Sequence, residues 1–287
     1  MKIASNKIKD IIRFFQEELS AEYERDELET IIAYCFEMFL CIDRATLTLN
    51  GNTTVTESEL LKFNFAVKDL KRHKPLQYIL GEADFYRLKF KVNEHVLIPR
   101  PETEELVDLI IHENKEREKI FILDVGTGSG CIPISLKKNL SSAIVSAIDI
   151  SEKALEVARE NAMLNNVQID WIQNDILADT FEPNALFDII VSNPPYICLS
   201  EKHSMHKNVL EYEPHLALFV DHEDPLLFYK VIADLALKYL NKNGRIYFEI
   251  NQALGPESQH MLESKGFKNV ALIRDLSNNY RILRGNI

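Results

Sequence analysis

The residue types best suited to hold a nucleotide-like ligand stand in one short segment. Its sequence is Asp124-Val125-Gly126-Thr127-Gly128-Ser129-Gly130; it contains three of the nine glycines of the chain and separates an apolar run from a helical pattern. Because glycine has no Cβ atom, a ligand can approach the backbone of such a turn, and the following helix offers free N–H groups at its start. The segment therefore predicts a binding loop formed by Gly126, Thr127, Gly128, Ser129 and Gly130.

Two common nucleotide-binding loops fit this segment less well. The dinucleotide fingerprint Gly-x-Gly-x-x-Gly needs a glycine at position 131, where the chain has Cys131. This mismatch disfavours a nicotinamide enzyme without excluding it. A loop of the Walker type is absent, because no Lys-Ser or Lys-Thr pair follows the glycines.

Polar side chains also end the next two predicted strands. Asp149 ends the second strand, where a carboxylate is suited to bind both hydroxyls of a ribose, and Asn174-Asp175 ends the third, where it could reach an adenine edge. Asp and Asn are also common as ordinary turn and cap residues, so one such residue alone is weak evidence. Three consecutive strands with polar ends favour a ligand site, because ligands of open α/β sheets bind at the carboxyl ends of the strands.

The loop after the fourth predicted strand has residue types that suit a reaction site. Its sequence is Ser192-Asn193-Pro194-Pro195-Tyr196. The two prolines fix two φ angles and remove two donors, so the loop is rigid and its carbonyl groups stay unpaired. The Asn193 amide oxygen and the Pro194 carbonyl could then accept the two hydrogens of a planar NH2 group, beside the flat ring of Tyr196.

The elements that must position these residues follow from the hydrophobic pattern. Short apolar runs alternate with helical patterns after residue 101, which predicts a doubly wound parallel sheet with helices on both faces. The expected strands are 119–125, 143–150, 169–173, 187–192 and 245–250, and the expected helices are 104–114, 131–139, 152–165 and 226–240. Two last strands, 270–273 and 280–283, are joined by six residues. This is too short for a crossover helix, so the pair should be antiparallel.

The chain before this sheet has a different pattern. Residues 1–83 carry only helical stripes, and Thr56 with Glu59 has the spacing of a capping box. From Phe85 the pattern alternates, which predicts a strand at 85–92, a turn at Asn93-Glu94 and a second strand at 95–98. The expected parts are an all-α bundle at 1–83 that recruits the substrate, a β-hairpin linker at 84–98 and a catalytic α/β domain at 99–287.

Composition narrows the classes of partner. The 287-residue chain has 33 Lys and Arg against 44 Asp and Glu, a net charge of −11, so it lacks the basic footprint of a protein that grips bulk nucleic acid. Residues 17–29 hold seven acids and one base, which indicates either a solvated helix face or a contact for a basic partner. The four cysteines form no CxxC pair, and no apolar run approaches about 18 residues. We therefore expect a cytoplasmic protein with no metal cluster, signal peptide or membrane span.

The combination of these motifs resembles the S-adenosylmethionine-dependent amino-methyltransferases. Those enzymes carry the glycine loop after the first strand, an acid after the second and variants of Asn-Pro-Pro-Tyr after the fourth. Further segments narrow the resemblance to one family, the peptide chain release factor N5-glutamine methyltransferases, also called HemK-type enzymes. These segments are Lys74-Pro75-Leu76-Gln77-Tyr78-Ile79-Leu80-Gly81, Phe85-Tyr86, the run from Val92 to Glu104, and Tyr212-Glu213-Pro214 with Ala217-Leu218.

This resemblance implies a fold, a reaction and a set of site residues. The fold is a seven-stranded methyltransferase sheet with the last strand antiparallel. The reaction transfers a methyl group from S-adenosylmethionine to N5 of a glutamine in a release factor, yields S-adenosylhomocysteine, needs no metal and modulates translation termination. The implied catalytic residues are Asn193, Pro194 and Tyr196, and Pro195 and Arg100 join them in binding the substrate. The implied cofactor-binding residues are the five of the glycine loop with Asp149, Asp175, Ile176 and Asn193. Some relatives have a larger aromatic ring at position 176, so stacking on adenine should be weaker here.

Two other functions stay open at this point. An amino-methyltransferase acting on adenine N6, cytosine N4 or guanine N2 would use the same loop, although the net charge of −11 counts against a nucleic-acid substrate. A catalytically silent scaffold that binds S-adenosylmethionine or a translation factor would have no need of a rigid amide-binding loop. In the favoured reaction the loop acts by orienting the substrate amide, an effect worth about 7–11 kcal/mol, and no residue is assigned as general base.

Overall fold

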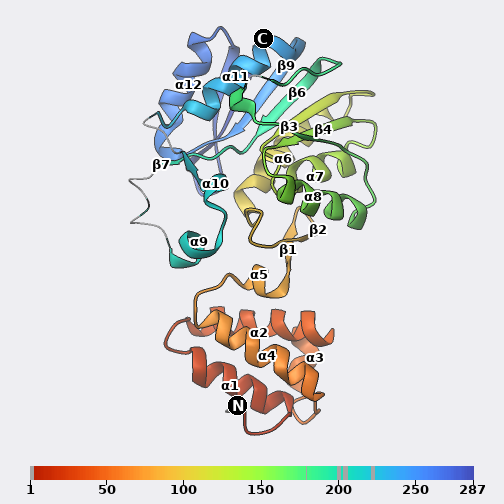
Figure 1. Ribbon diagram of the computed structural model, residues 1–287, viewed down its shortest axis with the longest axis vertical. Coiled ribbons are helices and arrows are strands. Elements are labelled where there is room, and N and C mark those ends of the chain that lie inside the picture. Colours follow the sequence, from red (N-terminus) through yellow and green to blue (C-terminus); the bar gives the residue numbers. More distant parts are fainter. Residues whose placement is uncertain (1–2, 179, 199–201, 203–205, 221–223) are drawn as a thin grey trace. The chain divides into compact units, whose positions relative to one another are not determined.

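A computed structural model describes residues 3–178, 180–198, 202, 206–220 and 224–287 of the chain (Figure 1). The chain divides into two compact units, a helical unit made of Met1–Gly81 with His206–Tyr212 and a sheet unit made of Glu82–Met205 with Glu213–Ile287. The elements are, in chain order, α1 (Ile8–Leu19), α2 (Arg25–Leu40), α3 (Arg44–Leu49), α4 (Glu57–Leu70), α5 (Leu76–Leu80), β1 (Glu82–Phe85), β2 (Leu88–Lys91), α6 (Pro101–Asn114), β3 (Phe121–Val125), α7 (Cys131–Asn139), β4 (Ile144–Asp149), α8 (Glu152–Leu164), β5 (Asp170–Gln173), the 3-10 helix η1 (Ile176–Ala178), β6 (Phe187–Ser192), β7 (Ile197–Cys198), α9 (Lys207–Tyr212), α10 (His215–Leu218), β8 (Phe219–Val220), α11 (Leu227–Tyr239), β9 (Leu240–Glu249), the 3-10 helix η3 (Gln252–Leu254), α12 (Gly255–Ser264), β10 (Lys268–Arg274) and β11 (Tyr280–Asn286).

The core of the helical unit is built from the apolar stripes of α1, α2 and α4. The buried ring of Phe63 on α4 lies 4.5 Å from that of Phe36 and 6.2 Å from that of Phe15, measured between ring centroids. The predicted capping box begins α4: the Thr56 N–H donates to the Glu59 carboxylate at 2.7 Å, and the Glu59 N–H donates to the Thr56 hydroxyl at 3.3 Å. The capping box and the helical character predicted for this region are confirmed.

One short helix of the helical unit comes from far along the chain. α9 groups with Met1–Gly81 and not with the elements that flank it in the sequence, and the Tyr212 hydroxyl donates to the Arg72 carbonyl at 2.8 Å. A helix of six residues spans fewer than two turns, too few positions to show an apolar stripe in the sequence. The prediction of an N-terminal domain at 1–83 therefore did not contain this segment.

The predicted β-hairpin exists, but its strands and its turn lie elsewhere. β1 and β2 pair antiparallel, with Phe85 opposite Leu88. The turn between them is Tyr86-Arg87, whose φ angles are 47° and 62°. The strand predicted at 85–92 therefore contains β2 but begins too early, because the hairpin turn lies at Tyr86-Arg87. The turn predicted at Asn93-Glu94 exists, but it does not join two strands.

The reason for this error lies in how the turn is stabilised. Two-residue hairpin turns need positive φ angles, and Asn or Gly usually occupies them. Here the turn residue is a tyrosine whose N–H donates to Glu104 and whose hydroxyl donates to Asp108, each at 2.8 Å. These partners on α6 are distant in the sequence, so no local signal marks the turn.

The second predicted strand, at 95–98, is also wrong. A turn precedes it, since the Val96 N–H donates to the Asn93 carbonyl at 3.1 Å. The Ile98 N–H then donates to the carboxylate of Glu213 at 3.3 Å, which takes the place of a strand partner. Val96 and Ile98 are buried, so the alternating pattern there reflects burial without a sheet.

The sheet unit contains the predicted seven-stranded sheet. Its strand order is β10-β11-β9-β6-β3-β4-β5. The row from β9 through β6, β3 and β4 to β5 is parallel, whereas β11 is antiparallel to both β9 and β10. The doubly wound sheet with an antiparallel last strand is thereby confirmed. The largest shift in bounds is at β9, which begins at Leu240 and not at 245.

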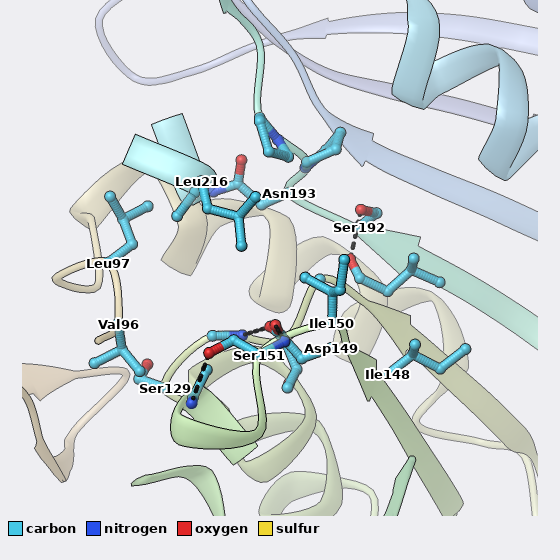
Figure 2. Close-up of a pocket in the computed structure, with 18 of the residues that line it drawn as sticks. Val96, Leu97, Ser129, Ile148, Asp149, Ile150, Ser151, Ser192, Asn193 and Leu216 are labelled. Carbon is cyan, nitrogen blue, oxygen red and sulfur yellow. Dashed lines mark hydrogen bonds between the residues drawn. The ribbon is translucent and has the colours of Figure 1, made fainter. Parts of the chain in front are cut away.

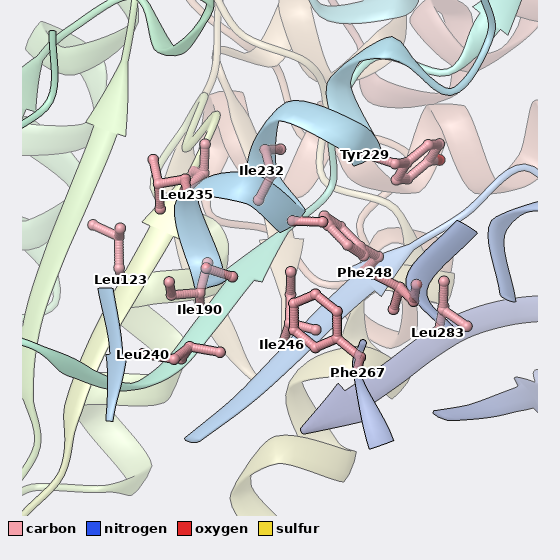
Figure 3. Packing of buried hydrophobic residues seen from close by; sticks show 14 of the residues in the cluster. Leu123, Ile190, Tyr229, Ile232, Leu235, Leu240, Ile246, Phe248, Phe267 and Leu283 are labelled. Atoms are coloured by element: carbon pink, nitrogen blue, oxygen red, sulfur yellow. The ribbon is translucent and has the colours of Figure 1, made fainter. Parts of the chain in front are cut away.

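Helices cover both faces of this sheet (Figure 1). α11 and α12 pack on one face over a buried cluster, shown in Figure 3, that includes Leu123, Ile190, Ile232, Ile246, Phe248 and Phe267. α6, α7 and α8 pack on the other face over a second cluster that includes Ile122, Val145, Ile189, Leu106, Ile134 and Ala162. Successive residues of a strand point to opposite faces, so Ile189 and Ile190 enter opposite cores. The carboxyl edge of the parallel strands is thus held by packing on both sides.

Candidate functional site

A cavity of about 310 Å³ lies at the carboxyl ends of β3, β4, β5 and β6, within the sheet unit (Figure 2). In Figure 2, Asn193 and Leu216 lie in the upper part of this cavity and Asp149 and Ser151 in the lower part. Most of the residues predicted from the sequence line it: Arg100, Gly126, Thr127, Gly128, Ser129, Asp149, Asp175, Ile176, Asn193, Pro194 and Pro195. Gly130 and Tyr196 do not. The structure therefore gathers both predicted loops around one space.

The glycine loop is held against the end of β4 by its own backbone. The N–H groups of Gly126 and Thr127 donate to the Ile148 carbonyl at 2.9 and 3.0 Å. Gly126 and Gly128 have φ angles of 76° and 55°, and a Cβ atom added at either residue would meet nothing within 4 Å. The backbone of the loop thus borders open space, as a close approach by a ligand requires.

Gly130 has a structural task. It caps the N-terminus of α7 with a φ of 79°. An added Cβ atom would lie 3.0 Å from the Ile134 side chain and 3.1 Å from those of Ala158 and Trp171. This glycine lets α7 pack closely, while Gly126 and Gly128 border the cavity.

Asp149 joins the end of β4 to the glycine loop. One carboxylate oxygen accepts the Gly128 N–H at 2.8 Å and the other accepts the Ser151 N–H at 2.9 Å. Burial raises the pKa of Asp149, and the backbone N–H groups oppose this rise. Each carboxylate oxygen has two acceptor sites, so both oxygens can accept a further hydrogen bond from a ligand hydroxyl.

The end of β5 supplies one unpaired acceptor. Asn174 Oδ1 is buried and has no hydrogen-bond partner among the described residues, while Asn174 Nδ2 donates to the Thr180 hydroxyl at 3.1 Å. The Asp175 carboxylate accepts the Leu177 N–H at 2.9 Å and so closes the first turn of η1. Ile176 adds apolar surface, since it lines the cavity and packs against the core cluster.

The second loop is fixed where it leaves the sheet. The Ser192 hydroxyl donates to the Val125 carbonyl at 2.6 Å and joins the ends of β6 and β3 (Figure 2). Asn193 Nδ2 donates to the Thr103 hydroxyl at 3.4 Å, and this hydroxyl donates to the Glu249 carboxylate at 2.6 Å. The oxygen of the Asn193 amide is therefore left to accept hydrogen bonds from a ligand.

Tyr196 lies behind this loop. Its ring packs against the core cluster between the sheet, α11 and α12, and its carbonyl accepts a hydrogen bond from Asn251 Nδ2 at 3.5 Å. Burial raises the pKa of its hydroxyl, and the nearby Glu249 charge adds to the rise. The predicted stacking of a substrate on this ring stays a prediction.

Arg100 is paired inside the protein. Its guanidinium donates to the carboxylate of Glu213, whose side chain is 1% exposed. Glu213 also accepts the Ile98 N–H, as described above. The charge of Arg100 is therefore compensated by a buried partner, and its predicted contact with the substrate stays a prediction.

Asp124 is a fully buried acid near the end of β3, two residues before Gly126 of the glycine loop. Its side chain is fully buried and both carboxylate oxygens are without a hydrogen-bond partner in the described chain. Burial raises its pKa to about 7; the nearby Thr127 hydroxyl lowers it and the charge of Asp149 raises it further. A buried acid of this kind costs stability when it ionises, and such groups are common at functional sites.

Sequence reasoning missed Thr103, Glu213 and Glu249 as site residues. Glu249 ends a buried strand next to β6, so the argument applied to Asp149 would have found it. Asn174 is predicted together with Asp175 to reach an adenine edge, but it is not among the implied cofactor-binding residues. Thr103 and Glu213 lie in segments quoted for the family resemblance, but their partners are distant in sequence and no spacing reveals them.

The described part of the chain contains no group of three His, Cys, Asp or Glu side chains arranged to hold a metal ion. Among its helices, none has both the length and the apolar character needed to cross a membrane.

Comparison with known proteins identifies family models and relatives that match this chain. The model of the "Methyltransferase small domain" matches residues 104–212 and that of the "PrmC N-terminal domain" matches residues 10–81. The release factor glutamine methyltransferase of Flavobacterium psychrophilum is 49% identical over 97% of this chain and 99% of its own length. The enzyme of the same name from Bacteroides thetaiotaomicron is 41% identical over 96% of this chain and 99% of its own length. Among solved structures, a methyltransferase from Pyrococcus furiosus has a similar fold, with a TM-score of 0.51 at 16% identity over 80% of this chain and 98% of that one.

Proposed function

Because the chain belongs to the family of release factor glutamine methyltransferases, we propose that it transfers the methyl group of S-adenosylmethionine to the side-chain amide nitrogen of a glutamine in a peptide chain release factor. This family is the one that the sequence motifs predicted, and that prediction is confirmed. The observation that carries the proposal is the 49% sequence identity to the Flavobacterium psychrophilum enzyme over 97% of this chain. The cavity supports it, because the glycine loop and the Asn193 loop border one space.

Residues of the chain fit S-adenosylmethionine at the lower part of the cavity. Asp149 has acceptor sites for ribose hydroxyls, and the unpaired Asn174 Oδ1 suits the amino group of adenine. Gly126 and Gly128 leave open space beside the backbone, and Ile176 supplies apolar surface. We also assign Asp175 to the cofactor site, because it lines the cavity. S-adenosylmethionine supplies a methyl group bound to a positively charged sulfur, so we propose that the reaction uses no metal, and S-adenosylhomocysteine is the product.

The Asn193 loop then acts on the glutamine. An amide nitrogen is a poor nucleophile because its lone pair is delocalised into the carbonyl, and the barrier of about 18–20 kcal/mol to rotation of a peptide bond shows the scale of this effect. We assign Asn193 Oδ1 and the Pro194 carbonyl as acceptors for the two N–H bonds of the glutamine, beside Pro195. When both N–H bonds are held, the lone pair of the amide nitrogen is directed toward the methyl group. Orientation of this kind can supply about 7–11 kcal/mol. The N–CH3 bond forms as the S–CH3 bond breaks, and the nitrogen then loses one of its two hydrogens as a proton, through Asn193 or water; we assign no general base.

A second contact should bring the release factor to the site. A glutamine that reaches a rigid cavity must come from an exposed loop, and such loops offer little apolar surface to grip. A separate contact raises the local concentration of the loop. None of the described residues of the helical unit lines the cavity, so we propose that this unit recruits the release factor. Since release factors act in translation, we place the reaction in the cytoplasm.

The test of this function is a methyl-transfer assay with radiolabelled S-adenosylmethionine. The enzyme is incubated with an intact release factor, with a short glutamine-containing peptide of the same loop, or with DNA. Asn193→Ala, whose turnover should be strongly reduced, serves as the matched control. We expect label in the intact factor, much less in the peptide at equal concentration, and none in DNA. Label in DNA and not in the factor would contradict the proposal, and equal label in peptide and factor would contradict the recruiting role.

A further inference from the structure

Asn193 is the first member of a hydrogen-bonded chain of three side chains from three parts of the fold. Asn193 follows β6, Thr103 lies in the first turn of α6 and Glu249 ends β9. Asn193 Nδ2 lies 3.4 Å from the Thr103 hydroxyl, and this hydroxyl lies 2.6 Å from Glu249 Oε2. Thr103 is 3% exposed and Glu249 is 1% exposed. The three hydrogen-bonded side chains therefore lead from the cavity wall into the interior of the sheet unit.

Glu249, the last of these three hydrogen-bonded side chains, fixes the direction of both hydrogen bonds. Burial raises the pKa of Glu249 to about 6, while the hydrogen bond from Thr103 and the charge of Arg281 lower it, so the carboxyl group is ionised at neutral pH. An ionised carboxylate only accepts hydrogen bonds. The single hydrogen of the Thr103 hydroxyl must then go to Glu249, and the lone pairs of this hydroxyl face Asn193.

The consequence for Asn193 is a defined orientation of its amide. A Thr103 oxygen that has already given its hydrogen to Glu249 can only accept from Asn193. The NH2 group of Asn193 therefore turns inward, and its oxygen turns to the cavity. The flipped amide would place two acceptors against each other and present an NH2 group to the substrate, where it would repel the hydrogens of a glutamine amide.

We propose that Thr103 and Glu249 are positioning residues that hold the Asn193 amide with its oxygen toward the substrate and so select a substrate group that carries two hydrogens. This inference rests on the proposed function, because it assigns Asn193 to the glutamine amide. It adds a reason for the choice of glutamine over glutamate, whose carboxylate has no hydrogen to give. Neither positioning residue touches the reacting atoms.

The matched variants are Thr103→Val, which keeps the shape and removes the hydroxyl, and Thr103→Ser, which keeps the hydroxyl. We expect Thr103→Val to lower kcat for an intact release factor about tenfold, the effect of one lost orienting hydrogen bond. Thr103→Ser should restore most of this loss. The calorimetric affinity for S-adenosylmethionine should stay within about twofold of wild type for both variants, because the lower part of the cavity is unchanged.

The same change in an Asn193→Ala background separates positioning from general stability. If Thr103 acts through Asn193, Thr103→Val should lower the residual kcat of Asn193→Ala by less than about twofold, since residues of one network are not additive. Glu249→Gln provides the second test, should Thr103→Val fail to fold. This variant removes the carboxylate charge that sets the direction of the two hydrogen bonds. It should lower kcat only while Asn193 is present.

The outcomes distinguish this inference from the proposed function. A wild-type enzyme that labels no release factor overturns both. A wild-type enzyme that labels the factor, together with a Thr103→Val enzyme of equal kcat, overturns the positioning role and leaves the function intact. Equal losses with and without Asn193 would likewise mean that Thr103 and Glu249 only stabilise the fold.

Discussion

Replacing Gly130 by alanine should destabilise the sheet unit by about 2–5 kcal/mol, whereas the same change at Gly128 should cost only about 1–2 kcal/mol. Both residues have left-handed φ angles, 79° and 55°, and an L-residue in that conformation costs about 1–2 kcal/mol. At Gly130 the new Cβ atom would also lie 3.0 Å from Ile134 and 3.1 Å from Ala158. Overpacking of this kind adds about 1–3 kcal/mol. At Gly128 nothing lies within 4 Å.

The assay is urea unfolding followed by the fluorescence of Trp171, which is the only tryptophan of the chain and lies in β5. It therefore reports on the sheet unit. Affinity for S-adenosylmethionine, measured by calorimetry, should show the opposite order, because a methyl group at Gly128 would stand in the cavity and one at Gly130 would not. Equal losses of stability for the two variants, or a larger loss at Gly128, would refute the separation of a binding glycine from a packing glycine.

Asp149→Ala should weaken S-adenosylmethionine binding about tenfold, because a charged acceptor is lost; wild-type affinity in calorimetry would remove Asp149 from the site. Tyr196→Phe should lower kcat only slightly and Tyr196→Ala strongly, because the ring packs against the core cluster; equal losses in the methyl-transfer assay would mean that the hydroxyl matters. Burial raises the pKa of Glu249 from 4.5 to about 6, so its ionisation costs the folded state about 2 kcal/mol, absent below pH 4.5 and complete above pH 6. In urea unfolding, the stability of Glu249→Gln relative to wild type should therefore rise by about 2 kcal/mol from pH 4 to pH 7, and a difference independent of pH would contradict the burial argument.

The parallel sheet and the two loops at its edge could be predicted because their signals are local. Three of the strands around the cavity, β3, β4 and β6, are largely apolar runs. Asp149 ends one of these strands and Asn193 directly follows another. A parallel topology then brings the ends of these strands together without any knowledge of side-chain contacts. The glycine loop was found in the same way, although the separate tasks of Gly128 and Gly130 needed the packing of α7 to be visible.

The errors arose where distant residues decide the local structure. The Tyr86-Arg87 turn depends on Glu104 and Asp108 of α6, so the hairpin was placed incorrectly. Distant residues also decide the partner of Arg100, whose pairing with Glu213 joins residues more than a hundred positions apart. The Asn193–Thr103–Glu249 chain also joins three elements. Hydrogen bonds of this kind leave no periodic pattern in the sequence, and only the fold reveals them.

Tandem mass spectrometry of the methylated release factor tests most directly whether the methyl group reaches the amide nitrogen of a glutamine. The intact factor is incubated with S-adenosylmethionine and either wild-type enzyme or Asn193→Ala, digested, and its fragments are sequenced by mass. We expect one added methyl group, placed on the side chain of a single loop glutamine by the wild-type enzyme and strongly reduced with Asn193→Ala. A methyl group on a lysine, an arginine or the N-terminus, or equal modification by the two enzymes, would contradict the proposed reaction.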